Sequence, residues 1–277
     1  MGLIEFTGAV LLMAVIAGLL GALTGLGGGV VIVPVLALLF HIDLRYAIGA
    51  SLVSVIATSS GAAVSFVREG FSNVRIGMFL EVATTVGALV GAFLTAHTSN
   101  HVIGVVFGLT LLYSAWSAFR EHPRQAPTEA NPLAQKLELH GDYPDGHGRQ
   151  AYVAQNVPAG FGIMFIAGVL SGLLGIGSGA VKVLAMDRAM KLPFKVSTTT
   201  SNFMIGVTAA ASAGIYLSRG YIAPGLAAPV MLGVLAGSIL GARLLIKIRV
   251  PVLRILFAIV IVALGVEMIY SGATGRL

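Results

Sequence analysis

Long apolar segments alternate with short polar ones along almost the whole chain. In the first half the apolar segments cover about 4–25, 29–40, 47–67, 74–96 and 102–119, and in the second half about 158–175, 179–191, 198–217, 222–246 and 251–271. Most of them approach the ~20 residues that a helix needs to cross a bilayer. Transmembrane β-barrels instead alternate in ~10-residue strands. We therefore predict an all-α membrane protein.

The pattern of the second half repeats that of the first at a constant distance of 150 positions. The motif Gly25-Leu26-Gly27-Gly28-Gly29 returns as Gly175-Ile176-Gly177-Ser178-Gly179. Further identities at this distance are Gly18/Gly168, Ser51/Ser201, Thr58/Thr208, Gly70/Gly220, Gly87/Gly237, Gly91/Gly241 and Ala92/Ala242. A register kept this long indicates an internal duplication. We predict two repeats of about five transmembrane segments each.

The two Gly-rich motifs are expected to interrupt helices. Glycines at every second position bare the backbone on all sides of a helix and cost roughly 1 kcal/mol each relative to alanine. In lipid, opened backbone must face protein or a water-filled cavity, and paired interruptions in two halves mark a transporter's binding site. Close helix packing is the competing explanation, and it fits the four-residue spacings Gly87/Gly91, Gly237/Gly241 and Gly104/Gly108.

The short segments 29–40 and 179–191 decide the topology. If both count as crossings, one side of the membrane holds the basic residues Arg68, Arg75, Arg120, Arg124, Lys136, Arg149, Arg188, Lys191, Lys195, Arg243, Lys247, Arg249 and Arg254, and the other holds Arg45, Arg219 and Arg276. If neither segment crosses the membrane, the same basic residues divide equally between the two sides. The positive-inside rule favours the first count, with the linker cytoplasmic, both termini outside and the two repeats inverted. Re-entrant or broken short segments remain open alternatives.

Residues 120–157 form the one long polar stretch, so we divide the chain into an N-terminal transmembrane repeat (1–119), a cytoplasmic linker (120–157) and a C-terminal transmembrane repeat (158–277). Within the linker, Lys136–His140 and Gln150–Ala154 flank a turn-rich segment, which predicts a β-hairpin. His140 and His147 lie there without cysteine or ordered carboxylates nearby, so no metal site is predicted.

Composition excludes several classes of protein. Of 277 residues, 57% are hydrophobic and 10% charged, against roughly 25% charged in soluble domains. The net charge of +6 sits in loops, where membrane topology explains it better than nucleic-acid binding. The absence of cysteine removes thiol chemistry. No predicted span carries two histidines or paired carboxylates, so we expect neither an enzyme nor a cofactor.

A small polar cluster follows each Gly-rich motif. In the first half it is Gly49–Ser51, and in the second Ser197–Asn202, which has six consecutive hydroxyl or amide side chains. These donors, together with free N–H groups at helix starts, suit an anion. Helix capping explains two or three of the six. The expected binding residues are Gly25, Gly27, Gly28, Gly29, Ser51, Gly175, Gly177, Ser178, Gly179, Lys182, Thr200, Ser201 and Asn202.

Lys182 lies within the second short segment, where the first half has Ile32. An ionisable group inside a membrane segment is a candidate for function, either by pairing with an anionic substrate or by releasing a proton. Snorkelling to the interface or pairing with Asp187 remain alternatives. Glu81 and Glu267 are the other acidic candidates, both expected near membrane surfaces. The aromatic residues Tyr113, Trp116, Tyr216 and Tyr270 fit interfacial belts.

With these residues assembled, the chain resembles the TauE/SafE sulfite exporter family, also called the TSUP permeases. The resemblance rests on the motif Gly25–Pro34 followed by Ala47–Leu52, on Gly168–Gly179, and on the linker leading to Tyr152 and Asn156–Pro158. Two departures are Ser178 in place of Gly28 and Leu184 in place of Pro34, so the second half is expected to bind differently.

The resemblance implies a multi-pass transporter in a prokaryotic inner membrane that carries small sulfur-containing anions such as sulfite, sulfonates or thiosulfate. Its expected partners are this anion, a coupling proton or sodium ion, the lipid bilayer and a second copy in a homodimer. The mechanism we expect is alternating access around broken helices from both halves. An anion channel, or a transporter of a non-sulfur organic anion, is the alternative.

Overall fold

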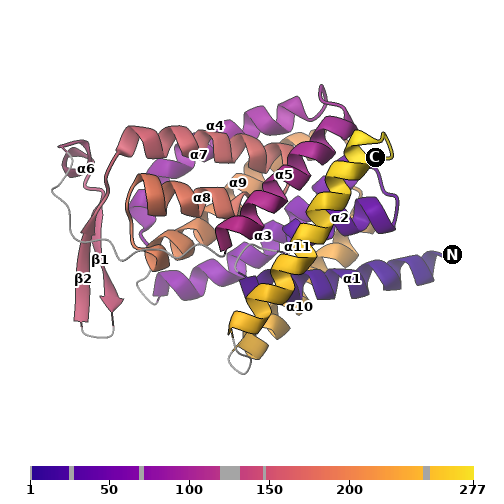
Figure 1. Cartoon of the computed structure of the whole chain (residues 1–277), viewed down its shortest axis with the longest axis horizontal. Coiled ribbons are helices and arrows are strands. Elements are labelled where there is room, and N and C mark those ends of the chain that lie inside the picture. The colour runs from indigo at the N-terminus through magenta and orange to yellow at the C-terminus, as the bar shows by residue number, and fades with distance from the viewer. Residues whose placement is uncertain (1, 25–27, 69–71, 119–131, 146–147, 246–249) are drawn as a thin grey trace.

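Helices make up nearly all of the protein in the computed structural model, which describes residues 2–24, 28–68, 72–118, 132–145, 148–245 and 250–277 (Figure 1). The first half contains α1 (Leu3–Thr24), α2 (Gly29–Pro34), the π-helix η1 (Val35–Leu39), α3 (Leu44–Arg68), α4 (Val74–Leu94) and α5 (Asn100–Ala118). After α6 (Pro132–Lys136), β1 (His140–Asp145) and β2 (Gly148–Val153), the second half contains α7 (Val157–Leu174), α8 (Gly179–Leu184), the π-helix η2 (Ala185–Ala189), α9 (Phe194–Ser218), α10 (Pro224–Leu245) and α11 (Val250–Ala273).

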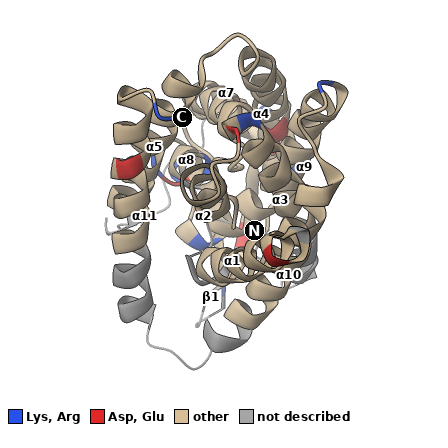
Figure 2. Ribbon diagram, turned by 90° about the vertical axis from the view of Figure 1, so that its right-hand side faces the viewer, with Lys and Arg blue, Asp and Glu red and all other residues tan. Residues whose placement is uncertain are grey.

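The prediction of a helical membrane protein is confirmed. Four of the described helices are long and apolar enough to cross a membrane, over Ile4–Gly21, Val74–Leu94, Val157–Leu174 and Pro224–Gly241. Shorter apolar helices cover Gly29–Leu39, Leu44–Ser59 and Ala258–Ala273. Figure 2 shows how few charged positions the described helices carry.

The two short segments are half-length helices. Each consists of six α-helical residues followed by five π-helical ones. At 1.5 Å per residue each reaches about 16 Å, roughly half of the ~30 Å hydrocarbon core. Two residues after each π-helix the chain turns at a residue with positive φ, His41 or Lys191, both at 52°. Neither short segment is therefore long enough to cross a bilayer alone.

The hairpin lies at one end of the molecule, and both chain ends lie at the other (Figure 1). At the hairpin end, the side-chain amide of Asn73 donates to His140 O at 3.2 Å, and Gln155 N donates to Met190 O at 2.8 Å. The starts of α4 and α9 are therefore at this end. At the other end, Asn100 donates to Asp43, and Arg219 donates to Ala92 O at 3.1 Å.

Helices of one half pack chiefly against helices of the other, α1 against α10 and α4 against α7. At Gly18 an added Cβ would lie 2.2 Å from Val234 O, and at Gly168 it would lie 2.2 Å from Thr84 O. These two contacts are related by the same distance of 150 positions. Backbones this close leave room only for glycine. Predicted close packing is likewise confirmed at Gly87, Gly91, Gly104, Gly108 and Gly237.

The linker contains an antiparallel hairpin whose first strand differs from the prediction. The pairs run from His140↔Val153 to Asp145↔Gly148, so residues expected in the turn are in β1. The predicted strand Lys136–His140 is wrong, because Pro132, well suited to a first helical turn, begins α6 just before it. Pro144 fits within β1 because both strands of a two-stranded sheet are edge strands.

Candidate functional site

The second Gly-rich motif interrupts the helix between α7 and α8. Gly175, Gly177 and Ser178 have φ values of 67°, 71° and 46°, all in the left-handed region. Glycine adopts this conformation without a steric penalty, whereas for serine it costs roughly 1–2 kcal/mol because of its Cβ. The equivalent Gly28 has a helical φ of −66° and caps the start of α2. Gly25 and Gly27, expected in the first interruption, lie outside the described residues.

The two Gly-rich motifs meet inside the protein. The Ser51 hydroxyl donates to Gly175 O at 2.8 Å, and its side chain is fully buried. An added Cβ at Gly29 would lie 2.5 Å from Ser51 Oγ and 3.3 Å from Gly175 O. Ser51 of the first half therefore fixes the main chain of the second interruption.

A small pocket lies beside this junction, with an empty volume of about 220 Å³. It is lined by Val30, Thr110, Ser114, Ile176, Ser178, Gly179 and Val181. This volume includes open solvent, and the enclosed part is only about 10 Å³, room for about one water molecule. Ser178 is only 3% exposed, and its hydroxyl has no hydrogen-bond partner within the described structure. An unpartnered buried hydroxyl that lines a pocket is a ready contact for a polar solute.

Helix α5 supplies two pocket hydroxyls that the sequence reasoning missed. Thr110 donates to Val106 O and Ser114 donates to Thr110 O, both at 2.8 Å. Such hydroxyls can turn their protons toward a ligand. The available signal was the pair of hydroxyl residues four positions apart in an otherwise apolar helix, which places both on one face.

Lys182 lies in a buried charged cluster rather than in the pocket lining. Its ammonium group donates to the Thr208 hydroxyl, and the Thr208 oxygen lies 2.6 Å from Glu81 Oε1. Thr85 also donates to Glu81 Oε1, at 3.1 Å. Lys182 is fully buried and Glu81 is 4% exposed, so neither side chain lies on the protein surface. The expectation that Glu81 lies near a surface is wrong.

The position of Glu81 had a signal in the sequence. Along α4, Gly77, Thr84 and Ala88 are buried, while Met78, Val82 and Val86 are exposed. Small residues therefore face the neighbouring helices and large apolar residues face outward, the arrangement expected in lipid. Glu81 falls on the small-residue face.

The polar cluster at the start of α9 bonds to the protein itself. Ser201 Oγ lies 3.4 Å from Gly179 O, and the Thr200 hydroxyl accepts from Asn73 N at 3.0 Å. Asn202 is half-buried. Of the residues predicted to bind an anion, Ser178 and Gly179 line the pocket, whereas Ser51, Ser201 and Thr200 support the elements around it.

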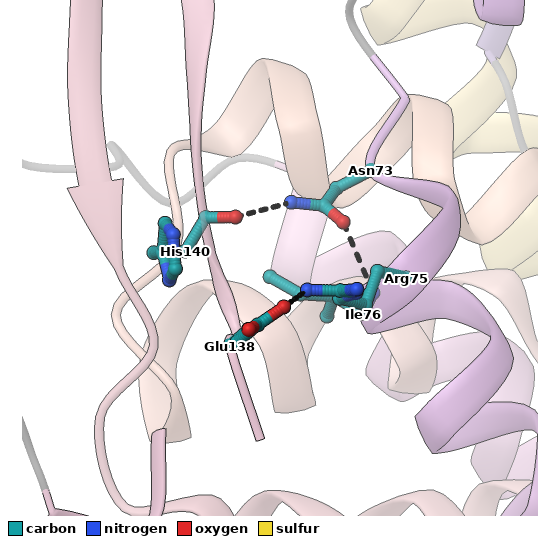
Figure 3. A network of polar contacts seen from close by, with 5 residues as sticks. All are labelled: Asn73, Arg75, Ile76, Glu138 and His140. Atoms are coloured by element: carbon teal, nitrogen blue, oxygen red, sulfur yellow. Dashed lines mark hydrogen bonds and ion pairs between the residues drawn. The ribbon is translucent and has the colours of Figure 1, made fainter. Parts of the chain in front are cut away.

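Asn73 connects the hairpin to α4 and α9 (Figure 3). Its carbonyl oxygen accepts from Ile76 N at 3.0 Å and caps α4, while its amide donates to His140 O and to the Tyr152 hydroxyl. Burial raises the pKa of Tyr152, so the phenol stays protonated at neutral pH. Arg75 and Glu138 form an exposed ion pair beside this junction (Figure 3). The hairpin is thereby tied to the polar end of α9.

Tyr216 corrects another expectation. It is 1% exposed and its hydroxyl bonds to Thr95 Oγ1 at 2.9 Å and to Gly172 O at 3.0 Å. It therefore joins α9 to α4 and α7 instead of lying in an interfacial belt. Trp116 and Tyr270 are 50% and 48% exposed, and an interfacial position for them stays a prediction.

Known proteins resemble this chain along nearly its whole length. Residues 10–268 match the family model described as "Sulfite exporter TauE/SafE". The probable membrane transporter protein YunE of Bacillus subtilis (strain 168) is 26% identical over 268 residues, covering 94% of this chain and 96% of YunE. YdhB of the same strain, also named a probable membrane transporter protein, is 27% identical over 233 residues, covering 84% and 86% of the two chains.

A more distant relative is the probable membrane transporter protein MJ0441 of Methanocaldococcus jannaschii, 23% identical over 273 residues and 94% of each chain. No solved structure gives a significant match. The family match, the named relatives and the apolar helices agree, and the chain therefore belongs to the sulfite exporter TauE/SafE family of membrane transporters.

Proposed function

We propose that this protein is a secondary transporter of small sulfur-containing anions such as sulfite, sulfonates or thiosulfate, coupled to an ion gradient and located in a prokaryotic inner membrane. The observation that carries the proposal is the pocket beside the two Gly-rich motifs, which is lined by Ser178, a residue whose hydroxyl is buried and unpartnered in the described structure. Its hydroxyls and main chain offer donors to oxyanion oxygens. In the present conformation it has room for about one water molecule, so binding of an anion requires the surrounding helices to move apart.

The proposed mechanism is alternating access between two inverted repeats, residues 1–119 and 158–277. Support comes from α2 and α8, which begin 150 positions apart and end near opposite ends of the molecule, η1 near Asp43 and η2 near the hairpin. The contacts Gly18–Val234 and Gly168–Thr84 obey the same relation. A closed pocket at the junction of the repeats can open to either side when one repeat rocks against the other.

The proposed orientation places the linker in the cytoplasm and both termini outside. In its support, Arg75 lies at the hairpin end through Glu138, whereas Arg45 and Arg219 bond to Thr98 O and Ala92 O at the opposite end. The side with more Lys and Arg in its loops is normally cytoplasmic.

A binding screen on the purified full chain tests the substrate class. Sulfite, thiosulfate, sulfate, taurine and sulfoacetate are compared with acetate and phosphate by thermal shift, and the best ligand is then followed by counterflow in proteoliposomes. We expect a sulfur anion to stabilise the protein most and to exchange across the vesicle membrane. A preference for a non-sulfur anion, a cation or a neutral solute contradicts the proposal, and flux that never saturates indicates a channel.

The Ser178→Gly variant tests the pocket. It copies Gly28 of the first motif and relieves the left-handed strain, so the protein should fold at least as well. Loss of one hydrogen bond to an anion, worth about 1–1.5 kcal/mol, weakens binding roughly tenfold. Ser171→Ala is the matched control, because its hydroxyl is also buried and unpartnered in the described structure but does not line the pocket. Equal binding by Ser178→Gly and wild type places the anion elsewhere.

A further inference from the structure

The cluster of Lys182, Thr208 and Glu81 is a second candidate site, separate from the pocket lining. It joins α8, α9 and α4 and is closed to solvent, with exposures of 0%, 0% and 4%. A buried ion pair costs its full desolvation, and apolar side chains of similar size often serve stability equally well. The cluster therefore calls for a functional explanation.

The same protein supplies an apolar counterpart of this cluster. At the distance of 150 positions, Lys182, Thr208 and Glu81 correspond to Ile32, Thr58 and Met231. Ile32 is fully buried in α2, as Lys182 is in α8. The short helix and its π-helical turn form in both places. The charges are thus not needed to build the element.

The hydrogen bonds around Thr208 accommodate two protonation states. Its single hydroxyl proton has two acceptors within reach, Glu81 Oε1 at 2.6 Å and Met204 O at 2.9 Å. When Glu81 is ionised, Thr208 donates to it. When Glu81 is protonated, Glu81 can donate to Thr208, and Thr208 then donates to Met204 O. The cluster can take up a proton without losing a hydrogen bond.

The surroundings of the other carboxylate oxygen favour this protonation of Glu81. Its second carboxylate oxygen, Oε2, is buried and without a hydrogen-bond partner in the described part of the chain. An ionised carboxylate with one unserved oxygen pays a desolvation cost that protonation removes. Glu81 is thus a half-satisfied acceptor close to a buried ammonium group that donates to Thr208.

Several other ionisable side chains lie on the elements around the cluster. The elements packed around it carry Arg45, Tyr46, Arg68, Arg75, His101, Tyr113, Asp187, Arg188, Lys195 and Tyr216. Helix α7 carries none. Buried among the described side chains of this set are Asp187, on the π-helical turn after Lys182, and Tyr216, which bonds to Thr95. Glu81 is joined to Lys182 through their shared hydrogen-bond partner, Thr208.

Helix α8 links the cluster to the pocket. Lys182 N donates to Ser178 O at 3.1 Å, and Val181, next to Lys182, lines the pocket together with Ser178. The pocket lining itself contains no charged side chain among the described residues. An anion held there needs a nearby positive charge that is not already balanced.

We propose that Glu81 binds the coupling proton of this transporter, and that protonation frees the charge of Lys182 to balance a bound anion, so that proton and anion cross together. One proton adds to the Glu81 carboxylate from one side and leaves to the other. The lysine ammonium is separated from the carboxylate by the Thr208 hydroxyl alone, so a second cation such as sodium is repelled. This inference rests on the proposed anion transport.

An infrared experiment tests the proton site independently of any anion. Difference spectra of the purified protein between neutral and acid buffer should show the carbonyl band of a buried protonated carboxylic acid. The band should disappear in Glu81→Gln and remain in Glu267→Gln, whose carboxylate is exposed on α11. A band that is absent from the wild type, or that persists in Glu81→Gln, overturns the proposal. If Glu81→Gln does not fold, Thr208→Val decides, because loss of its hydroxyl should shift the band and an unmoved band overturns the assignment.

Proteoliposomes test coupling with ³⁵S-thiosulfate as the probe and pyranine as the internal pH indicator, in sodium-free buffer. The wild type should accumulate thiosulfate with an inward proton gradient and acidify the lumen. Glu81→Gln should keep thiosulfate exchange but lose gradient-driven accumulation, whereas Glu267→Gln should keep both. Failure of exchange in the wild type counts against the proposed function, while exchange without any response to the proton gradient overturns only the inference.

Discussion

The two short helices, α2 and α8, have the same shape and different chemistry. Both begin at a glycine of a Gly-rich motif, run six residues and continue as a five-residue π-helix. The buried centre of α2 is Ile32, while that of α8 is Lys182. The same backbone forms around isoleucine in α2 and around lysine in α8. The short helix therefore does not need the lysine charge in order to fold. The predictions below extend this comparison to other pairs of residues that share a position in the repeat or a backbone conformation but differ in their contacts.

Removing the lysine alone should have the largest effect. Lys182→Ile leaves Glu81 buried without its counter-charge, which should lower the free energy of unfolding by about 3–5 kcal/mol. The double variant Lys182→Ile/Glu81→Met copies the first half and should recover most of that loss. Thermal unfolding of the purified proteins measures both. If the double variant is as unstable as the single one, the charges are structural after all.

Thr208 and Thr58 are equivalent in position but not in contacts. The Thr208 hydroxyl lies between Lys182 and Glu81, so Thr208→Val should cost about 1–3 kcal/mol by leaving buried charges underserved. Within the described structure Thr58 bonds to carbonyls of its own helix, at Ser54 and Val55, and Thr58→Val should stay within about 0.5 kcal/mol of wild type. Equal losses would remove the distinction between the two halves.

Gly177 can be compared with Gly220, which has nearly the same backbone conformation in a different place. Their φ values are 71° and 74°, so alanine should cost roughly 1–2 kcal/mol at each. An added Cβ meets Ile205 at 2.6 Å at Gly177 and nothing within 4 Å at Gly220. We expect anion counterflow to fall in Gly177→Ala and to persist in Gly220→Ala. Loss of flux in both would attribute the effect to strain alone.

Ser51 and Ser201 should show the smallest difference. Ser51 donates to Gly175 O at 2.8 Å, a normal hydrogen bond, whereas Ser201 lies 3.4 Å from Gly179 O. Ser51→Ala should cost about 1 kcal/mol and Ser201→Ala less than about 0.5 kcal/mol. Denaturant titration of the two variants measures the difference. The reverse order would mean that Ser201 is the better-bonded residue in solution.

Much of the helical layout could be predicted from the sequence because apolar length and helix-breaking glycines are local signals. The predicted segment 179–191, for example, matches α8 and η2, which together end at Ala189. Partner choice is not local. The glycine at position 168 indicates a close helix contact, but the neighbouring sequence does not indicate that the contacting residue is Thr84.

The candidate site was predicted in part for the same reason. Ser178 and Gly179 belong to a motif, and they line the pocket. Thr110 comes from a helix far away in the sequence, and its contribution depends on how α5 packs. The burial of Glu81 depends on which face of α4 meets its neighbours, and because an apolar helix in lipid has no polar face, the available signal is the small residues on the buried face, such as Gly77 and Ala88. The error at Tyr216 is similar, since position near a helix end does not fix its direction.

The crosswise packing of the helices has a consequence for how the protein is made. The glycine-lined faces of α1 and α4 fit α10 and α7, which are synthesised only after the hairpin. Until α7 and α10 enter the bilayer, the glycine-lined faces of α1 and α4 have no helix to pack against. Membrane insertion of α1 and α4 therefore precedes their final packing, which begins only after α7 and α10 have been synthesised and inserted.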